Sequence, residues 1–441
     1  MSSPVRIGLL GCGVVGSGFL RLAADRTLAI EDAVGAPLSV TRLAVRKPDK
    51  QRSVDLSGVT VGTDAMAVAE AEDVDVLVEL MGGAEAAYPP VRRALERGRP
   101  VVTANKHLIS IYGEELEALA ASSGASLRYE GSVAGVIPIL QSLEHGLRTE
   151  RFTLLVGILN GTTNYILSTM EREGRDFAEA LEAARELGFA EADPSLDLSG
   201  ADTVQKLTVL SRLAFRVPVP HGSIPAEGIV GMELEDLRQA DRFGYVVKLL
   251  GIALRTPAGL DFRVHPAFIP KRYLLASVRD EFNAVYLRGD ASGSMMLYGK
   301  GAGALPTAQA VLGDVMAVAR ESRLRAGHPA AATSGAVAPR RRTASDSAED
   351  ERLTLDEIQT RYYLRLLVED QTGVLAQVAH RLGASRVGIA QMFQAPGLRG
   401  EAEITILTHE ARDRDTRDAV KAIAALPSVR RAPRAIRIFD V

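Results

Sequence analysis

Short apolar segments separated by segments with helical periodicity dominate the first 130 residues. Residues 5–10 form the first, a short apolar strand. Further strands are expected at residues 38–45, 76–80, 100–103 and 126–129. Helical patterns lie between most of them, including residues 89–97 and 114–123. This alternation predicts an α/β fold with a doubly wound parallel sheet.

The middle of the chain contains a polar turn between a strand and a helix. Residues 157–167 read as a strand, a turn rich in Gly, Thr and Asn, and the start of a helix. Hydroxyls, amides and N–H groups at a helix start suit a carboxylate, although a plain capped turn has the same composition. Further helical patterns begin at Asp202 and cover residues 308–320.

The C-terminal part has its own pattern. Residues 327–350 are rich in Ala, Pro, Ser and Arg and lack apolar periodicity, which predicts a flexible linker. From Tyr362 the order becomes strand, helix, strand, strand, helix, strand, and the strand at residues 387–391 is the least regular of these. We therefore expect a separate βαββαβ module.

Composition narrows the class of protein. The chain has 441 residues, which is enough for two or three domains. Hydrophobic residues make up 46%, charged residues 24%, and the net charge is −3, so nothing indicates a nucleic-acid partner. The single cysteine, Cys12, excludes an internal disulfide and a multi-cysteine metal site. With no leader pattern and no apolar run near ~20 residues, we expect a cytoplasmic protein that does not span a membrane.

A dinucleotide-binding turn follows the first predicted strand. The sequence GCGVVG at residues 11–16 is a G-x-G-x-x-G motif between a strand and a helix. Glycines here permit a tight turn and bring the backbone close to a pyrophosphate at the helix N-terminus. The predicted cofactor-binding residues of this turn are Gly11, Gly13, Val14, Val15 and Gly16.

Basic residues follow two further strands. Arg46 and Lys47 end the second strand. At this position an acidic residue would bind the ribose 2′-hydroxyl of NAD, whereas a basic residue would bind the 2′-phosphate of NADP. They favour NADP over NAD, and the alternative is a pair of solvated loop cations. Lys106 follows the strand at residues 100–103, at the sheet edge where ligands bind. This position would let Lys106 face the cofactor or the substrate, and the alternative is an ordinary surface lysine.

Four carboxylates and one lysine gather at residues 191–206, EADPSLDLSGADTVQK. Asp202 and Lys206 are one helical turn apart, and such a pair is often only a stabilising ion pair. Both lie on the apolar side of the helix, away from the polar face formed by Gln205, Thr208 and Arg212. This placement makes them candidates for moving a proton on an amino-acid substrate.

Six motifs in one order resemble the homoserine dehydrogenase family, in its monofunctional form with a C-terminal ACT domain. They are GCGVVG at 11–16, VELMGG at 78–83, TANK at 103–106, LNGTTNYIL at 159–167, GFAEADPSLDLSGADTVQKL at 188–207 and YGKGAGALPTA at 298–308. The resemblance implies reduction of L-aspartate 4-semialdehyde to L-homoserine by NADH or NADPH. It also implies a place in threonine, methionine and isoleucine biosynthesis.

The resemblance assigns roles to the candidate residues. Lys206 resembles the acid–base lysine, with Asp202 beside it, and Lys106 resembles the lysine near the nicotinamide and the reacting carbonyl. Glu191 and Asp197 resemble substrate-binding residues. Such roles fit the chemistry, because an ammonium can stabilise or protonate the oxygen that gains charge during hydride transfer.

Two further sites follow from the resemblance. Gly303, in a Gly-rich loop, resembles a residue beside the nicotinamide. The loop from residue 130 to residue 137 resembles one whose backbone carbonyls bind a structural sodium ion, at Glu130, Val133, Gly135 and Ile137. Carbonyl oxygens suit such a hard cation.

The resemblance also implies the domain organisation. We expect an NADP-binding Rossmann domain at 1–130 joined by 306–320, an α+β catalytic and dimerisation domain at 131–305, a linker at 321–358 and an ACT domain at 359–441. A homodimer or homotetramer with threonine as effector would be typical. Thr372 stands where this module usually has Pro, and the alternative is a dimerisation module that binds no ligand.

Two classes of protein compete with this interpretation. An aldehyde dehydrogenase would need a nucleophilic cysteine, and Cys12 lies inside the phosphate-binding turn. An NADP-linked reductase of another small polar aldehyde stays open. A non-catalytic sensor of NADP and an amino acid would not require the combination of acids and lysines found here.

Overall fold

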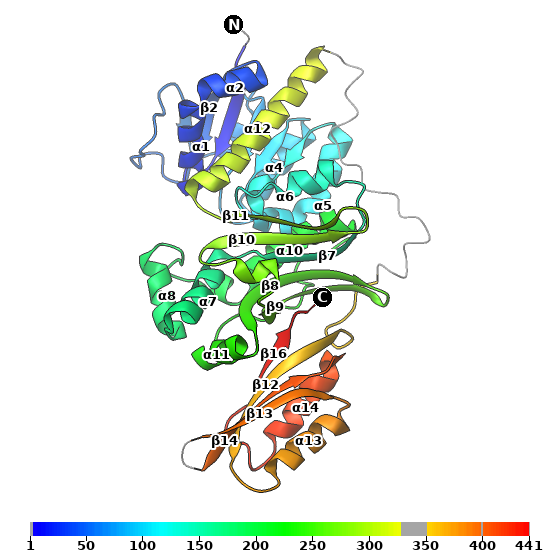
Figure 1. The fold of residues 1–441 in the computed structure, drawn as a ribbon. Helices are drawn as coiled ribbons and strands as arrows, with labels where there is room; N and C mark the ends of the chain where they lie inside the picture. Colours follow the sequence, from blue (N-terminus) through cyan, green and yellow to red (C-terminus); the bar gives the residue numbers. More distant parts are fainter. Residues whose placement is uncertain (1–2, 328–350, 398–399, 441) are drawn as a thin grey trace. The chain divides into compact units, whose positions relative to one another are not determined.

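The computed structural model describes residues 3–327, 351–397 and 400–440 and divides into two compact units (Figure 1). The first unit draws on residues 1–152, 205–223 and 282–342, and the second on residues 153–204, 224–281 and 343–441. Most of the predicted linker, residues 328–350, lies outside the described residues.

The first unit contains a six-stranded parallel sheet in the order β3-β2-β1-β4-β5-β6. Its strands are β1 (Val5–Leu10), β2 (Leu38–Ala44), β3 (Thr60–Gly62), β4 (Val76–Glu79), β5 (Val101–Thr103) and β6 (Leu127–Arg128). This order reverses direction between β1 and β4, which is the doubly wound topology that places a ligand at the carboxyl ends of the strands. The predicted sheet is confirmed, and β3 is an addition to it.

Helices cover this sheet. They are α1 (Val14–Asp25), α2 (Thr27–Val34), α3 (Ala65–Glu70), α4 (Tyr88–Glu96), α5 (Lys106–Ser123) and α12 (Ala304–Gly327). Helix α12 lies beside α1 (Figure 1), and Val311 and Val315 share a buried cluster with Ile7 and Phe19. Helix α12 is longer at both ends than the pattern at 308–320 predicted. The burial of α12 against α1 shows how a segment distant in sequence completes the nucleotide-binding part.

The remaining elements of the first unit are short helices and a hairpin. They are η1 (Glu130–Ser132), α6 (Ile139–Gln141), the π-helix η2 (Ser142–Gly146) and the antiparallel strands β10 (Phe282–Gly289) and β11 (Gly293–Lys300). Helix α10 (Ala201–Phe215) contributes its first four residues to the second unit and the rest to the first. One continuous helix therefore carries residues of both units.

In the second unit, seven strands are hydrogen-bonded in the order β7-β8-β9-β16-β12-β14-β13. They are β7 (Phe152–Ile158), β8 (Tyr245–Thr256), β9 (Gly259–Pro270), β16 (Arg434–Ile438), β12 (Gln359–Glu369), β14 (Glu401–Thr408) and β13 (Ile389–Pro396). The helices of residues 153–281 in this unit are α7 (Gly161–Glu173), α8 (Phe177–Glu186), α9 (Ser195–Leu198), α11 (Leu234–Arg242) and η3 (Leu274–Ser277). The pairing of β16 with β9 is parallel, with Ile438 opposite Phe268, so one sheet continues into the C-terminal part.

The C-terminal part has the predicted βαββαβ order. Helix α13 (Val374–Ala384) follows β12, and a two-residue strand β15 (Ala411–Arg412) precedes α14 (Asp413–Ala424). Both helices pack on one side of the sheet, where Val378 and Ile423 share a buried cluster with Leu364 and Ile404 (Figure 1). The least regular strand begins at Ile389 and pairs with β14 through a register shift. That this module is an ACT domain stays a prediction.

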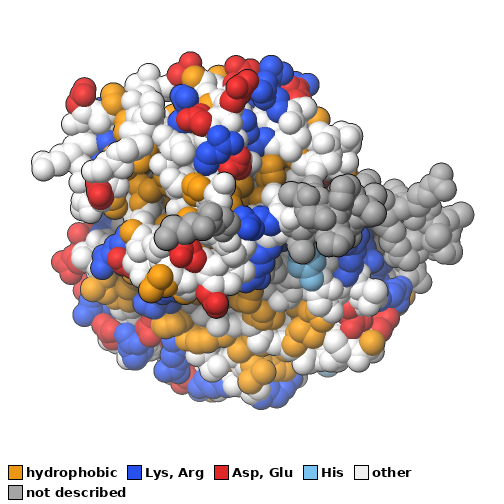
Figure 2. Space-filling view, turned by 90° about the horizontal axis from the view of Figure 1, so that it is seen from above, with side chains coloured by type: hydrophobic (Ala, Val, Ile, Leu, Met, Phe, Trp, Pro, Cys, Tyr) orange, Lys and Arg blue, Asp and Glu red, His pale blue; other side chains and the backbone are white. Residues whose placement is uncertain are grey.

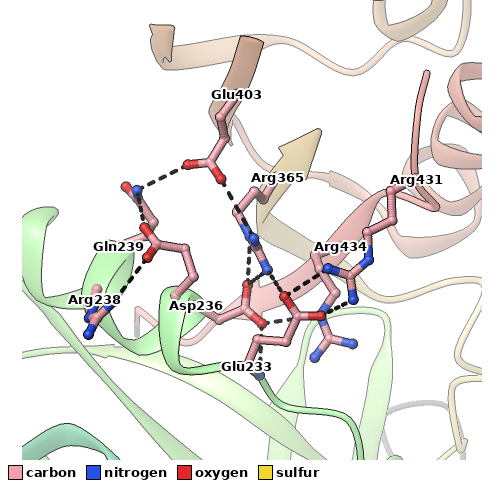
Figure 3. Close-up of polar contacts among 9 residues, drawn as sticks. Glu233, Asp236, Arg238, Gln239, Arg365, Glu403, Arg431 and Arg434 are labelled. Atoms are coloured by element: carbon pink, nitrogen blue, oxygen red, sulfur yellow. Dashed lines mark hydrogen bonds and ion pairs between the residues drawn. The ribbon is translucent and has the colours of Figure 1, made fainter. Parts of the chain in front are cut away.

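Ion pairs attach α11 to this module, as Figure 3 shows. Arg365 of β12 donates to Glu233 Oε2 at 2.6 Å and to Asp236 Oδ1 at 3.0 Å. Arg434 Nε donates to Asp236 Oδ2 at 3.2 Å. We define the α11 ion cluster as Glu233, Asp236, Arg365, Glu403, Arg431 and Arg434. Because the Asp236 side chain is fully buried, the guanidinium groups are needed to compensate its charge.

Acidic and basic side chains are interspersed over the surface seen in Figure 2. Such mixing accords with a net charge of only −3. Over the ranges 3–327, 351–397 and 400–440, none of the helices combines the length and apolarity that a membrane span requires.

Candidate active site

The glycine turn after β1 has the geometry of a phosphate-binding loop. Gly11 adopts φ +94°, and a Cβ there would lie 2.5 Å from the Leu80 carbonyl oxygen. A Cβ on Gly16 would lie 2.4 Å from the Gly11 carbonyl oxygen, whereas Gly13 faces open space. Helix α1 has no side-chain cap, and its first residue, Val14, is 73% exposed. The first turn of α1 therefore presents N–H groups to a ligand that can approach at Gly13.

Arg46 and Lys47 lie in the exposed loop that follows β2. Among the described residues, neither side chain forms a hydrogen bond or ion pair. The loop itself is shaped by Arg52, which donates to the carbonyl oxygens of Lys47, Pro48 and Lys50. Two cations at the carboxyl end of β2 are thus available to an anionic group on the cofactor.

Gly303 immediately precedes α12 and has φ +122°. A Cβ on Gly18 of α1 would lie 2.8 Å from the Ala304 carbonyl oxygen, so the two helices approach closely at this point. The loop that carries Gly303 is therefore held near the helix that begins with the glycine turn. This placement agrees with the cofactor role predicted for Gly303 without testing it.

Lys106 is the first residue of α5, which begins eight residues earlier than the pattern at 114–123 predicted. The start is fixed by Asn105, whose side chain accepts a hydrogen bond from the Leu108 N–H. The helix that carries Lys106 contacts α10, because Arg212 donates to the Ile109 carbonyl oxygen at 2.8 Å. The two helices that carry the predicted lysines therefore pack together in the first unit.

Asn160 joins two of the predicted carboxylates. Its side-chain oxygen caps α7 by accepting from the Thr163 N–H at 2.8 Å. Its side-chain nitrogen donates to Asp197 Oδ1 at 2.6 Å and to Asp202 Oδ2 at 2.9 Å. Thr162 Oγ1 lies 3.0 Å from Asp197 Oδ2. The Asn/Thr turn does bind carboxylates, and here they are those of Asp197 and Asp202.

Asp202 and Lys206 lie one turn apart at the start of α10, and both are buried, at 4% and 7% exposure. This burial agrees with their predicted position on the apolar side of the helix. The predicted polar face is wrong in part, because Thr208 is fully buried and Gln205 and Arg212 are only half-exposed. Helix α5 covers part of this side of α10, where Arg212 donates to the Ile109 carbonyl oxygen.

Glu191 lies in the loop between α8 and α9 and is exposed. It forms no hydrogen bond or ion pair with any of the described residues. The Asn160 contacts thus bring together Asp197 and Asp202 but not Glu191. A carboxylate in this state could bind a substrate ammonium, and that role stays a prediction.

The predicted sodium ligands are buried in the loop after η1. Glu130, Val133 and Ile137 are at most 3% exposed, and Gly135 has φ +57°. Among the described residues, the carbonyl oxygens of Val133 and Gly135 accept no hydrogen bond, whereas that of Ile137 accepts from the Ile139 N–H at 2.7 Å. Two carbonyl oxygens without donors fit a hard cation. The Glu130 carboxylate instead accepts from the N–H groups of Leu140 and Gln141.

The chain matches two family models. Residues 11–130 match the model described as "Homoserine dehydrogenase, NAD binding domain", and residues 138–316 match the model described as "Homoserine dehydrogenase". Together they cover both the glycine turn and the Asn160 contacts.

Relatives and solved structures agree with these matches. The homoserine dehydrogenase of Neisseria gonorrhoeae is 38% identical, over 99% of this chain and 98% of the relative, and that of Bacillus subtilis is 36% identical, over 98% of each. The crystal structure of a homoserine dehydrogenase from Thiobacillus denitrificans has a TM-score of 0.91 at 39% identity, with 99% of both chains covered. One from S. aureus has a TM-score of 0.77 at 29% identity, with all of both chains covered.

Proposed function

Because this chain belongs to the homoserine dehydrogenase family, we propose that Lys206, Asp202 and Lys106 carry its reaction. The activity is the reversible NAD(P)H-dependent interconversion of L-aspartate 4-semialdehyde and L-homoserine. The observation that supports these residues best is the Asn160 side chain, which binds both Asp197 and Asp202. Asp202 in turn lies one helical turn before the buried Lys206 on α10.

The proposed roles follow from charge. The nicotinamide supplies a hydride when it is bound. As the substrate carbonyl oxygen gains negative charge, Lys206 would give it a proton, and Lys106 would stabilise it by charge. Asp202, one helical turn before Lys206, would attract and orient its ammonium group by charge. Glu191 and Asp197 would bind the substrate ammonium, with Asp197 oriented by Asn160 and Thr162.

We also propose that the enzyme prefers NADPH to NADH. A 2′-phosphate would meet Arg46 and Lys47 at the end of β2, and neither side chain is engaged by a described residue. No carboxylate at this strand end competes for a ribose hydroxyl within residues 44–48. Guanidinium groups are well suited to phosphate because they bind it bidentately.

The substitution Arg46→Ala tests this preference. We expect kcat/KM for NADPH to fall by about 10–100-fold and that for NADH to change little, because a lost charge-assisted contact of about 1.5–3 kcal/mol affects only the phosphorylated cofactor. Initial rates with each cofactor at saturating semialdehyde measure the ratio. Lys50→Ala, in the same exposed loop, is the matched control. An unchanged NADPH/NADH ratio in Arg46→Ala would show that Arg46 does not bind the 2′-phosphate.

We propose that a sodium ion binds the carbonyl oxygens of Glu130, Val133, Gly135 and Ile137 and stabilises the loop after η1. The support is the pair of carbonyl oxygens, those of Val133 and Gly135, that accept no hydrogen bond from any described residue. Because the ligands are backbone atoms, the ion would stabilise the loop and take no part in proton transfer.

The oligomer and the domain boundaries remain proposals from the family resemblance. We propose a homodimer or homotetramer in the cytoplasm. We also keep the domains as a nucleotide-binding domain at 1–130 with 306–320, a catalytic domain at 131–305, a linker at 321–358 and an ACT domain at 359–441.

Threonine is the effector that we propose for the ACT module. We expect added threonine to lower the initial rate of the wild-type enzyme. A variant that lacks residues 359–441 is not a suitable control, because the deletion would also remove β16 from its pairing with β9. The measurement is a threonine titration at fixed substrate, with serine and valine as matched controls. A rate that threonine leaves unchanged would favour a module that serves assembly alone.

A further inference from the structure

A buried carboxylate that has no role in the proposed reaction lies at the end of β4. Glu79 is the last residue of this strand and is paired with Thr103, the last residue of β5. Both residues are 0% exposed. Burial raises the pKa of Glu79 to about 7, although hydrogen bonds from Thr103, Met81 and Asn105 oppose the shift. A buried ionisable group is costly, so its contacts are expected to serve a purpose.

Donors from two loops converge on the Glu79 carboxylate. The Met81 N–H donates to Oε1 at 2.7 Å, and the Thr103 hydroxyl donates to Oε2. The Asn105 side-chain nitrogen lies 3.5 Å from Oε1. Met81 follows β4, whereas Asn105 follows β5. Glu79 therefore connects the loops at the carboxyl ends of two neighbouring strands, the edge where ligands bind in a doubly wound sheet.

The contacts continue from Thr103 to the first turn of α5. Thr103 Oγ1 accepts a hydrogen bond from the Asn105 N–H at 3.0 Å. The Asn105 side chain accepts from the Leu108 N–H at 3.1 Å and donates to the Gly83 carbonyl oxygen at 2.7 Å. Because the Leu108 N–H donates to the amide oxygen and the Gly83 carbonyl accepts from the amide nitrogen, the Asn105 amide has one orientation. Asn105 therefore contacts Glu79 both directly and through Thr103, and these contacts fix where α5 starts.

We propose that Glu79 is a positioning residue that acts through Thr103 and Asn105 to place Lys106 for the reaction. The proposal rests on the role of Lys106 given under the proposed function. Lys106 is the residue directly after the cap, so a shift of Asn105 moves it with the helix start. Catalysis is sensitive to such shifts, since a displacement of about 1 Å can lower the rate ~10²-fold.

The test measures kcat and KM for Glu79→Ala, Glu79→Gln and Thr103→Val. We expect Glu79→Ala and Thr103→Val each to lower kcat by about 10–100-fold while KM for both substrates stays within about threefold. Glu79→Gln should recover most of the loss, because its amide oxygen can accept from Met81 and its amide nitrogen can donate to Thr103. In the double variant Glu79→Ala/Thr103→Val the losses should not multiply, because both interrupt one chain of contacts.

Thermal unfolding separates positioning from general stability. If Glu79→Ala lowers the melting temperature but kcat per folded enzyme stays within about twofold, the proposal is wrong. Multiplying losses in the double variant would also overturn it. The variant Lys106→Ala separates the proposed catalytic role of Lys106 from the positioning role of Glu79. An active Lys106→Ala enzyme removes the proposed role of Lys106, whereas an inactive one beside a fully active Glu79→Ala enzyme removes only the positioning role of Glu79.

Discussion

Replacing Lys206 by Ala is expected to lower kcat by several orders of magnitude, since positioned proton transfer alone contributes ~10²–10⁴-fold and the ammonium also stabilises charge. Lys206 is 7% exposed at the start of α10, so water cannot readily take its place. The affinity for NADPH should change little, because the glycine turn lies on a different helix. Steady-state kinetics with aspartate semialdehyde and a fluorescence titration with NADPH measure the two quantities.

A matched control uses a lysine of the C-terminal βαββαβ module. Lys421 lies on α14 and is 76% exposed, so Lys421→Ala should leave kcat unchanged. Lys106→Ala should resemble Lys206→Ala in kcat. A Lys206→Ala enzyme that keeps kcat within about threefold of the wild type would contradict its assignment as the acid–base residue.

The second large effect is expected on stability. Arg365→Met removes the guanidinium that binds Glu233 and the fully buried Asp236. Removing one partner of a buried ion pair leaves an uncompensated charge, which costs about 3–5 kcal/mol. The Arg365 side chain is only 12% exposed, so solvent compensates little of this charge. The free energy of unfolding in urea, followed by circular dichroism, measures the loss.

Two further variants interpret this result. Arg430 forms an ion pair with Glu369 but is 51% exposed, so Arg430→Met should cost at most about 1 kcal/mol. Adding Asp236→Asn to Arg365→Met should recover part of the loss, because the neutral amide can still cap α11 and no longer needs a cation. Equal stability of the Arg365 and Arg430 variants would mean that the α11 ion cluster contributes no more than a surface pair.

Acid should weaken the same cluster. Burial alone would raise the pKa of Glu233, but the hydrogen bonds and charges of Arg365 and Arg431 lower it below its ordinary value. A carboxylate with a lowered pKa in the folded state stabilises the fold above its ordinary pKa, and this contribution is lost as the pH falls through the folded value. The stability difference between wild type and Arg365→Met should therefore narrow in acid.

The parallel sheet was predictable because short strands alternate with helical segments along the first 130 residues. The glycine turn was predictable because its function requires those residues directly between a strand and a helix. The start of α5 was not, because the signal is one side-chain cap at Asn105 and the first turn is not clearly amphipathic. Thr208 shows a second limit, since a helix covered on several sides can bury a polar residue where periodicity predicts exposure.

The contacts that organise the site could not be derived from sequence. Asn160 is separated by 37 residues from Asp197 and by 42 from Asp202, and nothing local indicates that one amide binds both. Glu79 was within a motif but had no obvious partner, because Thr103 is 24 residues away on the next strand. Family resemblance assigned roles to the acids and lysines, and the structure adds the side chains that orient them.

Strand β16 has a consequence for the order in which the protein can fold during synthesis. It lies between β9 and β12 in the sheet, yet it is the last of the three to leave the ribosome. Strands β9 and β12 therefore cannot be joined through it until residues 434–438 have emerged. The βαββαβ module is left incomplete until then, with exposed strand edges at which β-rich intermediates tend to aggregate. Docking of the module therefore follows the synthesis of residues 434–438.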